Sequence, residues 1–275
     1  MADDATLTAA ATAELGSLDG RIAPAGETFI PATDEGLLRG DGAFEVIRVY
    51  DGKPFALADH LDRLERSAAS LRLEDVPRAE LEAEVAELVA ARGGSDWDGQ
   101  LRIVLTRGGR RLLLTEPLHE KPGTIRLGTV TYAPTRVLDG VKSLSYAANM
   151  LAGRLARERG FDEALLVTPH GRVLEAPTSS IFWVAADGRL CTPPLGEHIL
   201  ASITRQRVMA VVDVEERPCT LDDLRQAREA FLTSTTREAQ AVTAVDDIEL
   251  PEGEQTRKVS AALGARIEEE LAKLG

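Results

Sequence analysis

The sequence contains few residues of several types, and each shortage excludes a class of protein. It has two cysteines, Cys191 and Cys219, and four histidines in 275 residues, so we expect neither a disulfide framework nor a metal site. Lysine and arginine number 32 against 45 acidic residues, for a net charge of −13, and aromatic residues make up 4%. Nucleic-acid binding is therefore not expected, because it requires clustered basic residues and often stacking aromatics.

Long hydrophobic runs are also missing. No stretch reaches the roughly 18 apolar residues that a membrane-spanning helix requires. The N-terminal segment "MADDATLTAAATAELGSLDG" is acidic and rich in Ala and Thr, and it lacks the basic region and apolar core of a secretory signal. We therefore expect a cytoplasmic protein without membrane partners, with a loose N-terminal tail over residues 1–20.

Strands and helices alternate irregularly along the rest of the chain, which favours a mixed α/β (α+β) protein of two domains. The alternating segment "FEVIRVYDGKPFAL" predicts a hairpin that turns at Asp51-Gly52. The polar segment "TEPLHEKPGT", with two prolines and a glycine, is the best linker candidate. We place a small α/β domain at 21–116, an interdomain linker at 117–123 and a large domain at 124–275.

The segment "HLDRLERSAASLRL" is expected to form an amphipathic helix capped by Asp59. Its leucines form one stripe. His60, Arg63 and Ser67 share another face, and by themselves they indicate a face exposed to solvent.

Lys142 follows a turn-like Asp-Gly pair and precedes the Ala-rich helical segment "SLSYAANMLAGRLA". A lysine in front of a helix is usually a solvated charge. However, the positive end of the helix dipole favours a neutral amine, and a Schiff-base lysine must be neutral part of the time. Position alone leaves both interpretations open.

Three further features have an ordinary and a functional interpretation. Glu175 lies in the apolar segment "GRVLEAPTSSIF", and its carboxylate faces either solvent or a cleft. Ser202 and Thr204 mark a predicted helix start, as caps or as part of an anion site. Four hydroxyl residues, 233–236, follow a predicted strand and suggest an anion-binding turn.

Taken together, these segments resemble the class IV, fold-type IV, enzymes that use pyridoxal 5'-phosphate (PLP). This family contains D-amino-acid transaminases, branched-chain transaminases, (R)-selective amine transaminases and aminodeoxychorismate lyases. The similarity covers about Gly36 to Val242 in four segments: "GLLRGDGAFEVIRVYDGKPFALADHLDRLERSA", "VKSLSYAANMLAGRLARERGFDEALLV", "GRVLEAPTSSIFWV…LCTPPLGEHILASITRQRV" and "EAFLTSTTREAQAV".

The resemblance implies two domains with the cofactor between them, usually in a homodimer. It implies that Lys142 is the Schiff-base lysine and that Glu175 binds the pyridine nitrogen. The other residues implied to bind the cofactor are Arg63, Leu200, Ile203, Thr204 and Thr235. Those implied to line the substrate pocket are Phe44, Glu45 and Thr236, with Arg110 or Arg111 as candidates for the substrate carboxylate.

The sequence departs from the family pattern at three positions. Ser180 stands where members usually have Asn, and Arg39 stands where they usually have Tyr. Branched-chain transaminases carry a tyrosine five positions after the lysine, whereas Tyr146 is four positions after it. The segments "IVLTRGGRRLL" and "VKSLSYAANMLA" resemble the D-amino-acid transaminases and lyases more than the branched-chain enzymes, so we expect a transaminase that acts on D-amino acids and 2-oxo acids. Aminodeoxychorismate lyase is the first alternative and branched-chain L-amino-acid aminotransferase the second.

Overall fold

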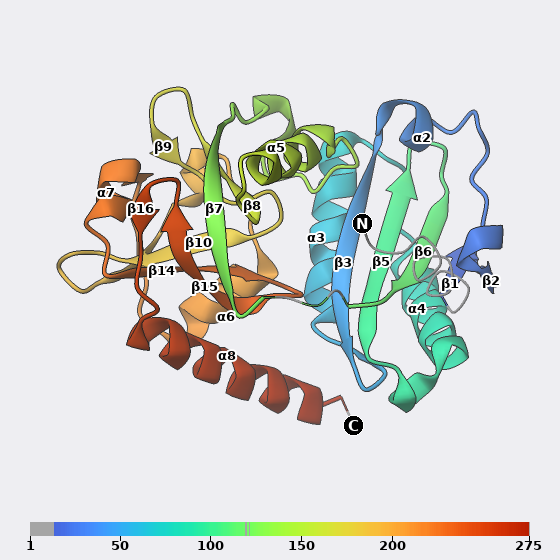
Figure 1. Cartoon of the computed structure of the whole chain (residues 1–275). Helices are drawn as coiled ribbons and strands as arrows, with labels where there is room; N and C mark the ends of the chain where they lie inside the picture. Colours follow the sequence, from blue (N-terminus) through green and yellow to red (C-terminus); the bar gives the residue numbers. More distant parts are fainter. Residues whose placement is uncertain (1–13, 119, 121, 275) are drawn as a thin grey trace. The chain divides into compact units, whose positions relative to one another are not determined.

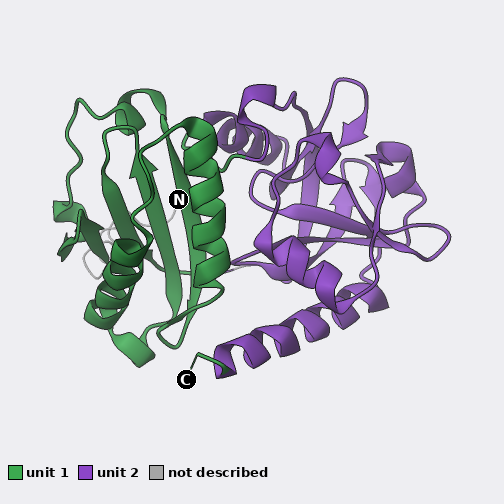
Figure 2. Ribbon diagram, turned by 180° about the vertical axis from the view of Figure 1, so that it is seen from behind, with its two compact units in different colours: residues 1–119, 141–145, 273–275 green, residues 120–140, 146–272 purple. Residues whose placement is uncertain are grey.

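The structure is a computed structural model that describes residues 14–118, 120 and 122–274. It divides into two compact units (Figure 2). Unit 1 comprises residues 1–119, Val141–Ser145 and 273–275, and unit 2 comprises Glu120–Gly140 and Tyr146–Ala272. The residues of unit 1 therefore come from separate stretches of the sequence.

Unit 1 is built on an antiparallel sheet of six strands in the order β2-β1-β6-β5-β3-β4 (Figure 1). The bounds are β1 Leu15–Leu18, β2 Arg21–Pro24, β3 Gly42–Tyr50, β4 Lys53–Pro54, β5 Gly99–Thr106 and β6 Arg111–Glu116. Its helices are α2 Glu35–Arg39, α3 Leu57–Leu71 and α4 Arg78–Arg92, with 3-10 turns at Ala25–Glu27 and Gly94–Asp96.

The core of unit 1 lies between α3, α4 and the sheet. Leu61 and Leu64 of α3 and Leu81 and Leu88 of α4 are fully buried, and each contributes about 1.5–3 kcal/mol of hydrophobic free energy. The predicted leucine stripe is confirmed by this burial. The helix begins at Leu57 after Ala56, so the expected Asp59 cap is wrong and Asp59 lies in the first turn.

Two-residue turns join the strands of two hairpins in unit 1, β1–β2 and β3–β4. Asp51 and Gly52 have φ of 46° and 73°, as a type I′ turn between β3 and β4 requires, which confirms the predicted hairpin. Asp19 and Gly20, with φ of 51° and 85°, form the equivalent turn between β1 and β2. The expected loose tail is therefore wrong for residues 15–20, because β1 pairs with both β2 and β6. Residues 1–13 lie outside the described residues.

Unit 2 contains a ten-stranded sheet in the order β12-β11-β10-β14-β15-β7-β8-β9-β13, with β16 paired to β15 (Figure 1). The pairs β7–β8, β7–β15 and β11–β12 are parallel. The strand bounds are β7 Thr124–Thr131, β8 Glu163–Val167, β9 Arg172–Val173, β10 Ser180–Val184, β11 Leu190–Thr192, β12 Glu215–Glu216, β13 Cys219–Thr220, β14 Glu229–Ser234, β15 Glu238–Val245 and β16 Ile248–Glu249.

Helices pack on this second sheet through small and branched apolar residues. They are α5 Ala147–Glu158, α6 Ile203–Val211, α7 Leu221–Arg225 and α8 Glu254–Ala272, with 3-10 turns at Arg136–Leu138 and Leu195–Glu197. Ala152 and Ala156 bring α5 close to β8. Phe182 of β10 stacks on Phe231 of β14 with 5.1 Å between ring centroids. No helix in the described part of the chain is long and apolar enough to cross a membrane.

Candidate active site

The segment that carries Lys142 belongs to unit 1, although residues 124–275 were assigned to the large domain from the sequence. It lies along the start of β3, where Ala43 and Ser143 form an antiparallel bridge. The Phe44 N–H donates to the Lys142 carbonyl at 3.0 Å, and the Leu144 N–H donates to the Gly42 carbonyl at 2.8 Å. Lys142 is therefore held by strand-like pairing.

The expected position of Lys142 at a helix start is wrong. Helix α5 begins at Ala147, after Tyr146, and the influence of a helix dipole falls off within about one turn. The amine is instead near an aromatic ring, since Lys142 Nζ lies 4.2 Å from the centroid of Phe44. A ring face attracts the protonated amine, so Phe44 contacts Lys142 through both its backbone and its side chain.

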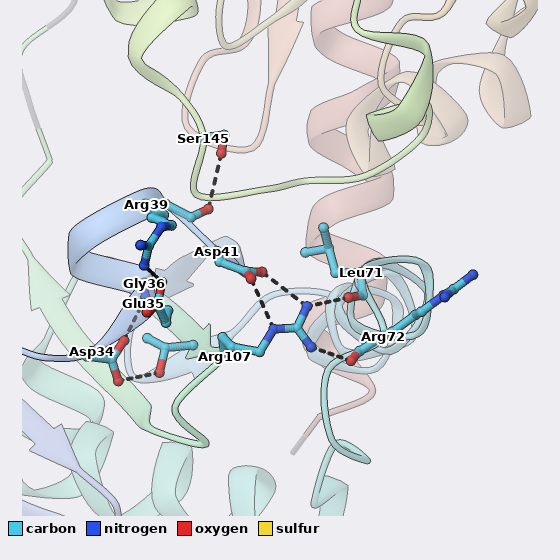
Figure 3. A network of polar contacts seen from close by, with 11 residues as sticks. Asp34, Glu35, Gly36, Arg39, Asp41, Leu71, Arg72, Arg107 and Ser145 are labelled. Carbon is cyan, nitrogen blue, oxygen red and sulfur yellow. Dashed lines mark hydrogen bonds and ion pairs between the residues drawn. The ribbon is translucent and has the colours of Figure 1, made fainter.

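The short motif Gly40-Asp41-Gly42 brings the Lys142 segment close to β3 and β5. A Cβ atom at Gly42 would lie 2.3 Å from the Leu105 carbonyl oxygen and 2.6 Å from Leu144 Cδ1. Only glycine fits this approach, because such distances are far below contact distance. Ser145 Oγ donates to the Gly40 carbonyl at 3.2 Å on the other side of the motif (Figure 3).

Arg107 fastens the same motif to the end of α3 (Figure 3). Its Nε donates to Asp41 Oδ2 at 3.0 Å, and its Nη2 donates to the Leu71 carbonyl at 2.6 Å. These contacts satisfy carbonyls that a helix end leaves without partners inside the helix. Arg107 therefore joins the glycine motif to helix α3.

One face of α3 contacts the Lys142 segment and β3. Ser67 Oγ accepts the Lys142 N–H at 3.1 Å. His60, Arg63 and Ser67 are 0%, 5% and 1% exposed, so the interpretation of this face as solvent-exposed is wrong. The spacing of three and four residues placed them on one face correctly. The sequence gave no signal that β3 would cover that face with a carboxylate.

That carboxylate is Glu45, which is fully buried at the centre of β3. Its Oε1 accepts Arg63 Nε at 2.7 Å, and its Oε2 accepts Arg63 Nη2 at 2.6 Å. His60 Nδ1 lies 2.8 Å from the same Oε2. Burial would raise the pKa of Glu45, but Arg63 and then His60 lower it to about 2, so Glu45 is ionised at neutral pH.

Arg110 and Arg111, the candidates for the substrate carboxylate, both have acidic partners within unit 1. Arg110 Nη1 donates to Asp19 Oδ2 at 2.8 Å. Arg111 Nη2 donates to Glu84 Oε1 of α4 at 2.7 Å. The structure thus brings Phe44, Glu45, Arg63 and Lys142 together, and it pairs these two arginines with Asp19 and α4.

Glu175 lies in unit 2, just after the short strand β9 and outside regular structure. Its Oε1 accepts the Leu200 N–H at 3.2 Å, which brings two predicted cofactor residues together. Tyr146 Oη donates to the Pro177 carbonyl, as does Asn149 Nδ2 at 3.1 Å. The start of α5 therefore holds the loop that follows Glu175, a contact that the sequence did not reveal.

The remaining predicted residues of unit 2 lie at the start of α6 and in the turn between β14 and β15. Ser202 caps α6 by accepting the Arg205 N–H at 3.2 Å, and Ile203 and Thr204 follow it, both buried. Thr235 and Thr236 are half-buried in the turn. The first N–H groups of a helix have no partner within the helix, so the start of α6 offers donors to an anion.

Comparison with known proteins identifies the family. Residues 42–245 match the family described as "Amino-transferase class IV". The chain belongs to the class IV aminotransferases. It is thus an aminotransferase that acts on amino and 2-oxo acids, and the resemblance inferred from its sequence is confirmed.

Individual relatives of this class IV aminotransferase differ in their named activities. The D-alanine aminotransferase of Bacillus licheniformis is 32% identical over 93% of this chain and 98% of its own. The bifunctional aminodeoxychorismate lyase / D-amino acid transaminase of Mycobacterium tuberculosis is 31% identical over 86% and 92%. The fold IV transaminase CpuTA1 of Curtobacterium pusillum is 32% identical, with a TM-score of 0.83 over 91% and 98%. The predicted fold class is therefore confirmed.

Class IV aminotransferases use PLP, and an aminotransferase from Mycobacterium tuberculosis with a TM-score of 0.83 and 26% identity was solved in a PLP-bound form. Each unit by itself contains groups of the kinds that bind this cofactor. Unit 1 contains an amine, Lys142, and a buried guanidinium, Arg63. Unit 2 contains a carboxylate, Glu175, and a helix N-terminus that carries the hydroxyl of Thr204.

Proposed function

We propose that this enzyme is a D-amino-acid transaminase, which moves the amino group of a D-amino acid to a 2-oxo acid. The observation that carries the proposal is the location of the Lys142 amine, 4.2 Å from the Phe44 ring centroid in the unit that also contains the buried Arg63. The similarity to D-alanine aminotransferase over 93% of the chain supports the choice of substrate.

The roles of the residues follow from their chemistry. When bound, PLP takes up the amino group at its aldehyde and accepts the electron pair released at the substrate α-carbon. Lys142 holds the cofactor and moves the α-proton, because a lysine amine can bond to an aldehyde and accept or return a proton. Ser67 and Phe44 fix the Lys142 backbone through hydrogen bonds. The amine can therefore move only as far as the rotation of its own side chain allows.

Other residues bind and orient the cofactor. Arg63 binds the phosphate, together with Thr235 and the N-terminal groups of α6 at Ile203 and Thr204. Glu175 binds the ring nitrogen and keeps it protonated, and the Leu200 N–H orients its carboxylate at 3.2 Å. Leu200 also packs against the ring. Phe44 and Thr236 line the substrate site. A homodimer and a cytoplasmic location stay predictions of the resemblance.

The absorbance of the purified enzyme tests the proposal, measured before and after addition of D-alanine without a 2-oxo acid. We expect a visible band that bleaches with D-alanine and returns with pyruvate. Lys142→Ala should lower turnover at least a thousandfold. Lys258→Ala, which changes an exposed side chain of α8, is the control. An absence of any visible band after incubation with PLP would contradict the role of Lys142.

Aminodeoxychorismate lyase is the second candidate, since a relative 31% identical to this chain carries both names. A visible band that D-alanine leaves unchanged, together with release of pyruvate from aminodeoxychorismate, would favour the lyase. Bleaching by L-leucine and not by D-alanine would favour a branched-chain aminotransferase.

A further inference from the structure

Both oxygens of the Glu45 carboxylate are engaged within unit 1. Arg63 donates to each of them through Nε and Nη2, at 2.7 and 2.6 Å, and the Glu45 side chain has no exposed surface. Two parallel, charge-assisted hydrogen bonds between an arginine and a carboxylate are among the strong hydrogen bonds of proteins, and they also fix the plane of the guanidinium. A carboxylate held in this way is poorly suited to contact a substrate.

His60 adds a third hydrogen bond to the same carboxylate. Burial lowers the pKa of His60, and the positive charges of Arg63 and Lys142 lower it further, against the opposing effect of Glu45. The imidazole is therefore neutral at neutral pH, so its Nδ1 carries the proton that it donates to Glu45 Oε2 at 2.8 Å. The cluster Glu45–His60–Arg63 thus has no net charge.

The orientation of Arg63 is consequently set before any ligand binds. An arginine side chain loses considerable rotamer freedom when it is fixed, and that loss weakens binding when it accompanies the binding event. Here α3 and β3 fix the side chain during folding, since Arg63 is 5% exposed. A guanidinium that is already fixed loses little further freedom when it binds a phosphate.

We propose that Glu45 is a positioning residue, which orients the Arg63 guanidinium for the phosphate of the cofactor and does not contact the substrate. This inference rests on the proposed function, because it assigns Arg63 to the phosphate. It replaces the sequence-based expectation that Glu45 lines the substrate pocket. It also predicts that Glu45 affects only ligands that carry the phosphate.

Equilibrium binding of PLP and of pyridoxal, which lacks the phosphate, tests the proposal when both are followed by visible absorbance. The variant is Glu45→Gln, whose amide can accept only one of the two Arg63 hydrogen bonds. We expect the dissociation constant of PLP to rise about tenfold or more, as it does when a partner that orients a ligand-binding group is lost. The constant for pyridoxal and, at saturating PLP, the KM for D-alanine should stay within twofold.

Glu14→Gln is the matched control in the same unit. Glu14 is 6% exposed, and it accepts from Arg92 Nε and Nη2 at 3.2 and 3.0 Å. It lies at the start of β1, which β6 and β5 separate from β3. This variant weakens the same type of buried pair, and binding of PLP should not change.

Three outcomes would overturn the inference. Binding of PLP by Glu45→Gln equal to that of Glu14→Gln would show that Glu45 does not act on Arg63. Equal weakening of PLP and pyridoxal would indicate a general disturbance of the fold. A raised KM for D-alanine with unchanged PLP binding would identify Glu45 as a substrate contact.

Arg63→Lys provides a second test that does not depend on the folding of Glu45→Gln. Lysine keeps the charge but cannot form two parallel hydrogen bonds with Glu45. We expect it to reduce the preference for PLP over pyridoxal at least tenfold, and a retained preference would show that charge alone is sufficient. If the unmodified enzyme failed to bind PLP at all, the proposed function itself would be wrong.

Discussion

The two units hold their candidate site residues in different ways. In unit 1, Glu45 and Arg63 lie in the middle of regular elements, at 0% and 5% exposure, and each fixes the other. In unit 2, Glu175 and Thr235 are half-buried in loops and turns, and backbone groups supply much of the support. Substitutions should therefore affect the stability of the fold strongly in unit 1 and mainly ligand binding in unit 2.

The largest effect should come from Arg63→Met. This variant leaves the Glu45 carboxylate buried without its cation, and such losses cost about 3–5 kcal/mol. Thr235→Val in unit 2 should change the free energy of unfolding by less than about 1 kcal/mol. Denaturant unfolding measures both values. The double variant Arg63→Met/Glu45→Leu should recover part of the loss, and no recovery would contradict the importance of the buried charge.

Acid should weaken unit 1 in two stages. Glu45 has a pKa of about 2 against an ordinary 4.5, so its contribution is complete above pH 4.5 and is lost as the pH falls toward 2. A shift of that size corresponds to about 3 kcal/mol. His60 has a pKa lowered from 6.5, so the unfolded chain takes up a proton first and stability begins to fall below pH 6.5.

His60→Asn separates the two stages, because the asparagine amide keeps the hydrogen bond to Glu45 but does not titrate. Unfolding measured between pH 8 and 3 should lose the slope that starts near 6.5 and keep the slope that starts near 4.5. Superimposable profiles of the variant and the original protein between pH 6.5 and 4.5 would contradict the neutral, buried imidazole.

Gly42→Ala should have an intermediate effect on unit 1. The added methyl group would overlap the Leu105 carbonyl at 2.3 Å and the Lys142 segment at Leu144, and overpacking of this type costs about 1–3 kcal/mol. Gly26→Ala is the control, since its Cβ would meet nothing within 4 Å. Thermal unfolding compares the two variants. Equal midpoints would show that β3 can shift away from Leu105 and Leu144 without loss of stability.

A smaller effect than those in unit 1 should come from Ser202→Ala in unit 2, which removes the cap of α6. Loss of a cap costs about 1 kcal/mol, and Ser202→Asp should restore it because aspartate accepts the same N–H. Unfolding in urea resolves a difference of this size. A loss of several kcal/mol would mean that unit 2 also depends on its site residues for stability.

The sequence predicted the local elements of both units better than their long-range contacts. The Asp51-Gly52 turn and the leucine stripe of α3 have local signals, and the structure confirms them. The β1–β2 hairpin also had such a signal in the Asp19-Gly20 pair. It was missed because the acidic segment rich in Ala and Thr around it was interpreted as a loose tail. The buried face of α3 had none, because only pairing with β3 brings Glu45 to His60 and Arg63.

The same difference between local signals and long-range contacts applies to the site residues. Family motifs named Lys142 and Arg63, but the anchoring of Lys142 by Ser67 joins residues 75 positions apart. The Glu175–Leu200 hydrogen bond spans 25 positions across a loop. Neither contact has a periodicity that can be recognised in a single sequence. Arg110 and Arg111 were candidates for the substrate carboxylate, but the structure pairs them with Asp19 and Glu84. These acidic partners are distant in the sequence, so the sequence did not reveal them.

The return of Val141–Ser145 to unit 1 has a consequence for synthesis of the chain on the ribosome. The six strands of unit 1 emerge by residue 116, but the segment that pairs with the start of β3 emerges only after β7 of unit 2. Until then the backbone of Phe44 and Gly42 lacks these partners. A gene cut at residues 117–123 would therefore encode an incomplete first unit, and fusions or truncations should include the chain beyond residue 145.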